Sequence, residues 1–307
     1  MNAVAAARLT GLDWGSTSLR AYLIGADGEV LAERSAASAA LGASTLSGAD
    51  AFAAALAQIR GDWDAQLPLL ACGMVGARHG WLEAPYAPCP AGAGELAAKT
   101  VQVPGGPRIV PGLICETGGV PDVMRGEETQ ILGALQRHPE LADAACIVLP
   151  GTHSKWARVE DGRVTGFATH MTGELYALLR RQSVLARLMP EDDPAAPAAF
   201  EAGVDAARDG GDAGLAHQLF AVRTLGLTEQ RAAAELPDYL SGLLIGHELL
   251  AGLLRPIDGR LAIVAEPALG ARYARALARF GVANPLLLGN TAVAGLVCVA
   301  REMGWIE

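Results

Sequence analysis

A carboxylate, a glycine and three hydroxyl residues follow one another near the start of the chain: Asp13, Gly15, Ser16, Thr17 and Ser18. Apolar runs flank this segment, which predicts a strand, a tight turn and a second strand. Glycine lets a ligand approach the backbone, and successive N–H groups in a turn can bind an anion. A carboxylate can hold hydrated Mg²⁺ against phosphate oxygens. The segment is therefore either a phosphate-binding hairpin or an ordinary hairpin with a polar tip.

A second segment has the same plan. An apolar run over residues 144–150 leads into a turn that begins with a glycine, and a further turn follows at residues 161 and 162. The first turn and the residues after it are Gly151, Thr152, His153, Ser154 and Lys155. Side chains alternate along a strand, so only one of Ser154 and Lys155 is expected to face a ligand. Two such hairpins indicate duplicated lobes that face one nucleotide across a cleft.

Composition limits the class of protein that carries these hairpins. The 307 residues are enough for two domains, and 51% hydrophobic with 19% charged residues is typical of a globular protein. A formal net charge of −9 without a Lys/Arg run argues against nucleic acid and anionic membrane surfaces as partners. The five cysteines lack paired short spacing, which favours a reducing compartment, and we expect a cytoplasmic protein without a signal peptide or membrane span.

The hydrophobic periodicity predicts the elements that must position the two hairpins. Expected strands cover the run from 9 to 35 and residues 68–74, 108–114, 144–150, 260–265 and 284–289. Expected helices cover 47–59 (with Ser47 as N-cap), 127–135, 172–187 (with Thr172 as cap), 200–225, 228–254, 271–280 and 291–303. Prolines 85, 88 and 90 predict irregular chain, and residues 115–122 predict a loop.

The chain resembles the sugar kinase, Hsp70 and actin superfamily and, within it, the 2-dehydro-3-deoxygalactonokinase family. The segments that carry the resemblance keep the family's order over nearly the whole chain: 13–20, 71–76, 123–130, 150–156, 171–175 and 240–246. The resemblance implies an α/β fold of two actin-like (ribonuclease H-like) lobes, each a mixed, five-stranded type of sheet flanked by helices. A nucleotide cleft would lie between lobes 1–143 and 144–307, with the final helix 291–303 near the interlobe connection.

The same resemblance implies the reaction. ATP, with Mg²⁺, would phosphorylate a 2-keto-3-deoxy sugar acid, turning 2-dehydro-3-deoxy-D-galactonate into its 6-phosphate in galactonate breakdown. The alternatives are a kinase for another sugar acid or a ketose, and a non-kinase regulator that binds ATP on the same fold. The expected partners are ATP and the small sugar acid, and a homodimer is one possible assembly.

Candidate roles follow for the phosphate-transfer residues. Asp13 would hold the metal through water, and the two hairpins would contact the phosphates. The base would be Glu127 first, because it opens a helix directly after Gly126, and Asp122 second. The simpler explanation is an acidic first turn that stabilises its helix by about 0.3–1 kcal/mol.

Candidate substrate residues lie at the end of the predicted strand 68–74, where ligands usually sit in open α/β sheets. Arginine suits a planar carboxylate best, and Arg20 would instead serve the strand or the phosphates. The candidates are Gly73, Met74, Val75, Arg78, His79, Trp81 and Arg125, with core packing as the alternative for Trp81. Adenosine contacts are expected from Glu266, Ala268 and Gly270, and residues 289–292 are expected to form a hinge rather than a contact.

Overall fold

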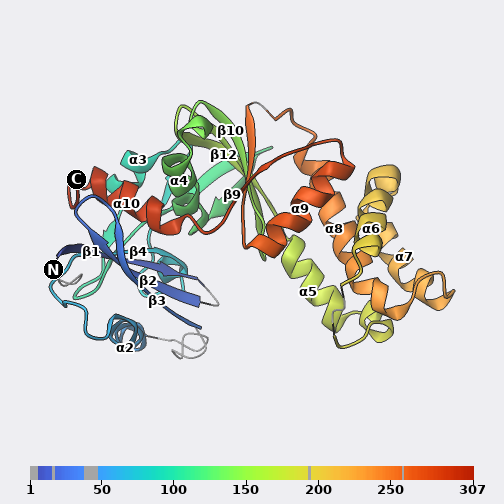
Figure 1. The fold of residues 1–307 in the computed structure, drawn as a ribbon, viewed down its shortest axis with the longest axis horizontal. Helices are drawn as coiled ribbons and strands as arrows, with labels where there is room; N and C mark the ends of the chain where they lie inside the picture. Colours follow the sequence, from blue (N-terminus) through green and yellow to red (C-terminus); the bar gives the residue numbers. More distant parts are fainter. Residues whose placement is uncertain (1–5, 16–17, 38–47, 193–194, 258) are drawn as a thin grey trace. The chain divides into compact units, whose positions relative to one another are not determined.

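The computed structural model describes residues 6–15, 18–37, 48–192, 195–257 and 259–307. Contacts within the chain define two compact units, whose segments can be followed by colour in Figure 1. Unit 1 comprises Met1–Ala145, Ala157–Phe167 and Asn290–Glu307, and unit 2 comprises Cys146–Trp156 and Ala168–Gly289. The functional lobe boundary after residue 143 and the nucleotide cleft between lobes stay predictions.

A six-stranded mixed sheet forms the centre of unit 1, in the order β3-β2-β1-β4-β7-β6. Its strands are β1 (Ala7–Trp14), β2 (Ser18–Gly25), β3 (Val30–Ala37), β4 (Leu69–Gly73), β6 (Val101–Gln102) and β7 (Arg108–Ile109). β1 pairs antiparallel with β2 and parallel with β4. The expected mixed α/β fold is confirmed, and the short antiparallel strand β6 gives this sheet a sixth member.

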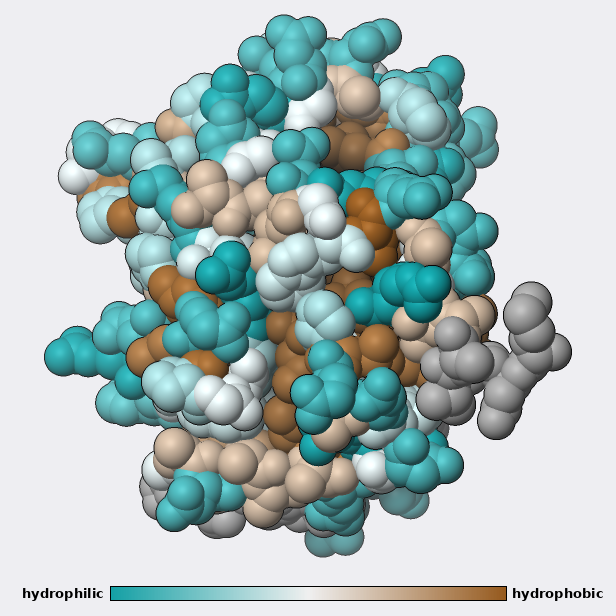
Figure 2. Space-filling model, turned by 90° about the vertical axis from the view of Figure 1, so that its left-hand side faces the viewer, coloured by the Kyte–Doolittle hydropathy of each residue, from teal (hydrophilic) through white to brown (hydrophobic). Residues whose placement is uncertain are grey.

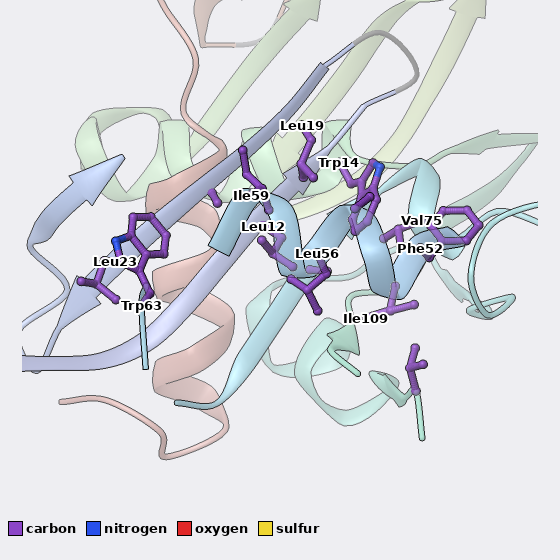
Figure 3. Packing of buried hydrophobic residues seen from close by; sticks show 14 of the residues in the cluster. Leu12, Trp14, Leu19, Leu23, Phe52, Leu56, Ile59, Trp63, Val75 and Ile109 are labelled. Atoms are coloured by element: carbon purple, nitrogen blue, oxygen red, sulfur yellow. The ribbon is translucent and has the colours of Figure 1, made fainter. Parts of the chain in front are cut away.

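One face of that sheet is covered by α2 (Ala49–Arg60), whose apolar residues recur at helical spacing. Phe52, Leu56 and Ile59 are buried on this helix and belong to the same core cluster as Trp14 of β1 (Figure 3). The Trp14 and Phe52 ring centroids are 5.5 Å apart. Trp81 completes an aromatic group, with its ring stacked on Phe52 at 5.8 Å. The end of β1 is therefore held by a packed aromatic core.

A small three-stranded sheet corrects three sequence predictions. The expected strand 108–114 is two strands, because β7 joins the large sheet while β8 (Gly112–Thr117) pairs with β5 and β9. The expected loop 115–122 is mostly a hairpin between β8 and β9 (Val120–Met124), turning at two glycines with positive φ. Pro88 lies in β5 (Tyr86–Pro88), an edge strand, where a missing N–H is tolerated.

The helices α3 (Ala93–Ala98), α4 (Glu127–Arg137) and α10 (Ala292–Glu302) complete unit 1. α4 and α10 lie side by side and cross at glycines (Figure 1). A Cβ at Gly133 would collide with the Thr291 carbonyl oxygen, and one at Gly295 with that of Thr129. This close approach ties the segment before α10 to the start of α4.

A five-stranded sheet with the order β12-β11-β10-β13-β14 provides the second hairpin. Its strands are β10 (Ala144–Leu149), β11 (Ser154–Glu160), β12 (Arg163–His170), β13 (Arg260–Val264) and β14 (Leu286–Leu288). The division into units passes through β10, β11 and β12. The strand, glycine turn and strand plan read from residues 144–160 is confirmed.

Unit 2 carries the helices α5 (Thr172–Gln182), α6 (Pro197–Gly210), α7 (Leu215–Leu227), α8 (Leu236–Gly252) and α9 (Pro267–Arg279). Several predicted bounds were wrong. α5 ends at Gln182, before a 3-10 turn, and its N-cap is Met171 rather than Thr172. The run 200–225 is broken at Gly210 to Gly214, and α9 begins four residues before the predicted start, with proline in its first turn. The predicted cap Ser47 lies outside the described residues.

The surface is mixed in character. Figure 2 shows polar residues interspersed with apolar patches on one face of the molecule. Among the described residues, every helix is too short or too polar to cross a lipid bilayer.

Candidate functional site

Asp13 lies one residue before the end of β1, where its carboxylate is held by neighbouring side chains. Asn290 Nδ2 donates a hydrogen bond to Asp13 Oδ2 at 3.2 Å, and Arg20 Nη1 lies 3.8 Å from the same oxygen. Burial raises the pKa of the Asp13 carboxyl, while the bond from Asn290 and the charge of Arg20 lower it. Asn290, expected only as part of a hinge, therefore contacts the candidate metal-side carboxylate.

Three segments of unit 1 meet beside Asp13. In the parallel pairing of β1 with β4, Asp13 lies opposite Cys72 and Trp14 opposite Gly73. A Cβ on Gly126, before α4, would stand 3.2 Å from the Gly73 Cα. The ends of two parallel strands and the start of a helix thus converge, as is usual for ligand sites in α/β sheets.

Two carboxylates open α4 at this junction. Glu127 Oε2 accepts a hydrogen bond from Arg125 N at 3.0 Å and is half-buried. Glu128 is fully buried, and its carboxylate accepts bonds from Gly126 N at 2.6 Å and from Thr129 Oγ1 at 2.9 Å. Burial, and then the charge of Glu127, raises the pKa of Glu128 to about 8. Sequence reasoning passed over Glu128, and Asp122 lies on β9 rather than on α4.

The β1–β2 turn, which is expected to bind phosphate, is only partly described. Gly15 N donates to Ser18 O at 2.9 Å, which closes the β1–β2 turn. Ser16 and Thr17, both expected to contact phosphate, lie outside the described residues. A single carboxylate beside this turn fits Mg²⁺, which usually keeps several waters and takes one or two carboxylates with phosphate oxygens. The described residues contain no cluster of three or more His, Cys, Asp or Glu that would make a protein-only cage.

The predicted sugar-acid residues separate into two groups. Gly73 lies at the junction, and Arg125 contacts the 3-10 turn Met74–Gly76, because a Cβ on Gly76 would stand 2.9 Å from Arg125 Nη1. Val75 is buried in the aromatic core, where the Trp81 ring also packs. Arg78 and His79 are exposed on the following loop.

Arg125 is unusual among these residues because part of its guanidinium is buried and has no partner in the part of the chain that the structure describes. Nη2 donates to Ala84 O at 2.8 Å, and the guanidinium carbon lies 4.4 Å from the Tyr86 ring centroid. Nε and Nη1 are buried and have no hydrogen-bond partner among the described residues. Buried donors of a cation normally find acceptors, so this group suits an incoming anion.

The second glycine turn, which is also expected to bind phosphate, lies in unit 2 between β10 and β11. Gly151, Thr152 and His153 are exposed there, and a Cβ on Gly151 would meet nothing within 4 Å. The fold itself therefore leaves room for a side chain at Gly151. Helix α5 begins against this turn, with Glu174 N donating to Thr152 O at 3.0 Å and its carboxylate 2.5 Å from His153 Nε2.

Ser154 and Lys155 follow the turn and contact different partners. Ser154 Oγ lies 3.0 Å from the Tyr273 hydroxyl. Lys155 is 5% exposed, and its Nζ donates to Thr169 Oγ1 at 2.8 Å. The role of Lys155 as a phosphate contact stays a prediction.

A cavity of about 510 Å³ opens beside this turn within unit 2. Its size is in the range of small-molecule sites. Its lining comes from the turn, α5, α8 and α9: Gly151, Thr152, Thr172, Gly173, Tyr176, Ala195, Asp238, Ser241, Leu244, Ile245, Leu269, Arg272 and Tyr273. The polar side is fixed by Arg272 Nη2, which lies 2.7 Å from Asp238 Oδ1.

Sequence reasoning missed most of this lining. The segment 240–246 was recognised as a family motif but received no role, although Asp238, Ser241 and Ile245 are spaced to share one helix face. From the expected adenosine segment, Leu269 lines the cavity, Ala268 lines a smaller neighbouring one, and Glu266 is the N-cap of α9. Because α9 starts earlier than predicted, Gly270 lies inside this helix, where it is buried.

The fold places the chain in a class, the actin-like ATPase and sugar kinase folds. The solved component A of (R)-2-hydroxyglutaryl-CoA dehydratase from Acidaminococcus fermentans has a TM-score of 0.52 at 11% identity, covering 97% of this chain and 98% of that chain. That likeness concerns the fold alone. Within the class, the chain belongs to the 2-keto-3-deoxy-galactonokinase family, whose model matches residues 13–299.

Individual proteins that are similar to this chain carry the name of the same family. The chain is 36% identical over 301 residues to the 2-dehydro-3-deoxygalactonokinase of Escherichia coli (strain K12), covering 97% of this chain and 99% of the relative. It is 39% identical to "Probable 2-dehydro-3-deoxygalactonokinase DgoK1" of Rhizobium meliloti (strain 1021), covering 95% and 96%. A crystal structure of a Sinorhizobium meliloti protein assigned as a 2-dehydro-3-deoxygalactonokinase has a TM-score of 0.84 at 38% identity, covering 96% and 99%. The resemblance drawn from the sequence segments is confirmed.

Proposed function

We propose that this chain transfers the γ-phosphoryl group of ATP to a 2-keto-3-deoxy sugar acid, converting 2-dehydro-3-deoxy-D-galactonate into its 6-phosphate. The observation that carries the proposal is the family match, which begins at Asp13 and runs to residue 299. Phosphoryl transfer of this kind depends mainly on positioning and electrostatic stabilisation.

The metal side of the reaction falls to unit 1. Asp13 would hold Mg²⁺ through water, and Asn290 and Arg20 keep its carboxylate oriented. When bound, the metal neutralises charge on the phosphate oxygens. Gly15, Ser16, Thr17 and Ser18 are assigned to the phosphates as backbone and hydroxyl donors.

The nucleoside side falls to the 510 Å³ cavity of unit 2. Leu244, Ile245 and Leu269 offer apolar contact to a base, while Asp238 and Ser241 offer polar contacts. Gly151, Thr152 and His153 are assigned to the phosphates. Contacts from Lys155, Glu266, Ala268 and Gly270 remain predictions.

The general base is assigned to Glu127, with Asp122 as the second candidate. Glu128 lies beside Glu127, but both of its oxygens accept hydrogen bonds and the side chain is fully buried. A base must reach the proton that it removes, so a half-buried carboxylate suits the role better. We assign Arg125 to the sugar-acid carboxylate because of its buried, unpartnered donors. Gly73, Met74, Val75, Arg78, His79 and Trp81 remain candidates for the sugar pocket.

The test is an ADP-release assay over 2-keto-3-deoxy acids, aldonates, ketoses and hexoses. We expect turnover only with a 2-keto-3-deoxy acid, and we expect Asp13→Asn to lower kcat by at least about a hundredfold, since it removes the charge that faces the metal. Glu127→Gln should abolish transfer and spare ADP binding. If Asp122→Asn does so instead, Asp122 is the base.

Other results of the same assay would replace the proposal. Turnover with an aldonate or ketose would change the substrate class. ATP hydrolysis that no sugar acid stimulates would favour a regulator that binds ATP. The cytoplasmic location and the homodimer stay predictions.

A further inference from the structure

Glu248, on helix α8, is a buried carboxylate that the proposed reaction does not use. Its side chain is 3% exposed, and it lies behind the lining residues of the 510 Å³ cavity rather than among them. Burying a carboxylate costs free energy unless its oxygens are well hydrogen-bonded. The hydrogen-bond partners of Glu248 therefore indicate the structural role of its side chain.

Three donors from three other elements converge on this carboxylate. Trp156 Nε1, on β11, donates to Oε1 at 2.8 Å. The Tyr273 hydroxyl, on α9, donates to Oε2 at 2.7 Å, and Thr172 Oγ1, at the start of α5, donates to the same oxygen. Burial raises the pKa of Tyr273 well above its usual value, so its hydroxyl stays protonated and able to donate.

Each of these donors lies next to the turn at Gly151 and Thr152 or is linked to it through a neighbouring residue. Thr172 is the first residue of α5, whose Glu174 N donates to Thr152 O at 3.0 Å. Gly173 packs so closely on Gly151 O that a Cβ would collide with it. Tyr273 reaches the other side of the turn through Ser154, at 3.0 Å. Trp156 lies two residues further along the same strand.

We infer that Glu248 is a positioning residue that fixes the turn at Gly151 and Thr152 beside the cavity, so that its N–H groups are preorganised for a phosphate of the nucleotide. The inference rests on the proposed function, since it concerns the site to which ATP is assigned. Donors that are already in place bind an anion without an ordering cost.

The sign of one substitution separates positioning from simple electrostatics. Glu248→Gln has nearly the same shape and removes a negative charge near the phosphate site. If Glu248 acted only through its charge, ADP would bind more tightly to the variant. Positioning predicts weaker ADP binding. The Trp156 indole can only donate, so it takes the single amide oxygen of the substituted side chain, and the amide NH₂ group then faces the two hydroxyls. Both hydroxyls must turn to accept hydrogen bonds instead of donating them.

The experiment measures ADP and adenosine affinity by calorimetry for the full chain, wild type and variant. We expect ADP affinity to fall by roughly tenfold in Glu248→Gln, because charge-assisted bonds are lost, while adenosine affinity stays within about twofold. The matched control is Val222→Ala, a core truncation on α7. Val222 belongs to a different apolar cluster from Trp156 and Tyr273, so the variant should lower Tm and leave both affinities unchanged.

An unchanged ratio of ADP to adenosine affinity in Glu248→Gln, or tighter ADP binding, would overturn the inference. Glu248→Ala is the stronger variant. If it does not fold, Tyr273→Phe cuts the arm to Ser154 and should lower the same ratio, and an unchanged ratio there also counts against the inference. Failure of wild type to bind ADP would instead refute the proposed function.

Discussion

At the residue scale, burial raises the pKa of two carboxyl groups in neighbouring parts of unit 1, while the charged residue beside each of them acts in opposite directions. Asp13 is partly buried, but Asn290 and Arg20 face it, and both favour its charged form. Glu128 is fully buried, and the neighbouring charge of Glu127 adds to the effect of burial. Burial is the largest cause in both cases, so each carboxyl group holds its proton more tightly than it would in water.

Glu128 gives a prediction about stability and pH. Its pKa of about 8 in the folded protein exceeds the ordinary 4.5, so the folded state holds the proton more tightly than the unfolded state. Its contribution to stability is complete below about pH 4.5 and is lost as the pH rises through about 8. Urea unfolding of Glu128→Gln should therefore show a shallower fall in stability over this window than wild type, by an amount on the order of 1 kcal/mol or more.

The control for that measurement is Glu83→Gln, which changes an exposed carboxylate of the same unit. It should keep the wild-type pH dependence. If both variants follow the wild-type curve, Glu128 has the same pKa in the folded and in the unfolded chain, and burial does not raise that pKa.

At the scale of elements, a glycine turn and the start of a helix form one structural piece in unit 2. Helix α5 packs its first turn directly on Gly151 and Thr152. The space that Gly151 leaves open and the close contact that Gly173 requires are different reasons for a glycine, and substitution separates them.

Gly151→Ala should leave Tm nearly unchanged, because its Cβ meets nothing within 4 Å. We expect it to weaken ADP binding by about tenfold, since the methyl group occupies the room that a phosphate would use. Gly173→Ala should lower stability by about 1–3 kcal/mol through overpacking. Thermal unfolding and calorimetry measure both effects, and unaltered ADP affinity in Gly151→Ala would remove this turn from the phosphate site.

At the scale of the whole molecule, ligand binding should stabilise some elements and leave others as they are. The cavity draws on α5, α8 and α9, whereas α7 supplies no residue to its lining in the described chain. Binding to the folded state alone adds free energy by mass action. The expected response is therefore local to the elements that line the cavity.

Hydrogen exchange with and without ADP tests this pattern. ADP at a hundred times its Kd adds about 2.7 kcal/mol to the stability of the bound state. Slowed exchange is expected at residues 151–152, 172–176, 238–245 and 269–273, with residues 215–227 as the internal reference. Equal slowing across α7 and the cavity elements would contradict nucleotide binding at this cavity.

Much of this protein could be predicted from short segments of the chain. The glycine turns at Asp13 with Gly15 and at Gly151 with Thr152 are recognisable because the residue types of such a turn stand next to one another in the sequence. Strand and helix positions follow from apolar periodicity, which is also local. The family could be recognised because several such segments recur in order along the chain.

Other features depend on residues that only folding brings together. Val110 and Pro111 separate β7 from β8, and Pro111 followed by Gly112 is a local turn signal that a single strand over 108–114 disregards. That the two halves join different sheets depends on pairing partners elsewhere in the chain. Helical spacing already places Glu128 on the face of Ile131, Leu132 and Leu135, whereas its complete burial and its hydrogen bonds depend on how α4 packs.

The sequence by itself determined the α/β class, the two glycine turns and the family, since these depend on neighbouring residues. Only the tertiary structure decided the bond from Asn290 to Asp13, across 277 residues, and the three donors around Glu248. The physical reason is that hydrogen bonding and burial depend on distance in space, and these partners are far apart along the chain.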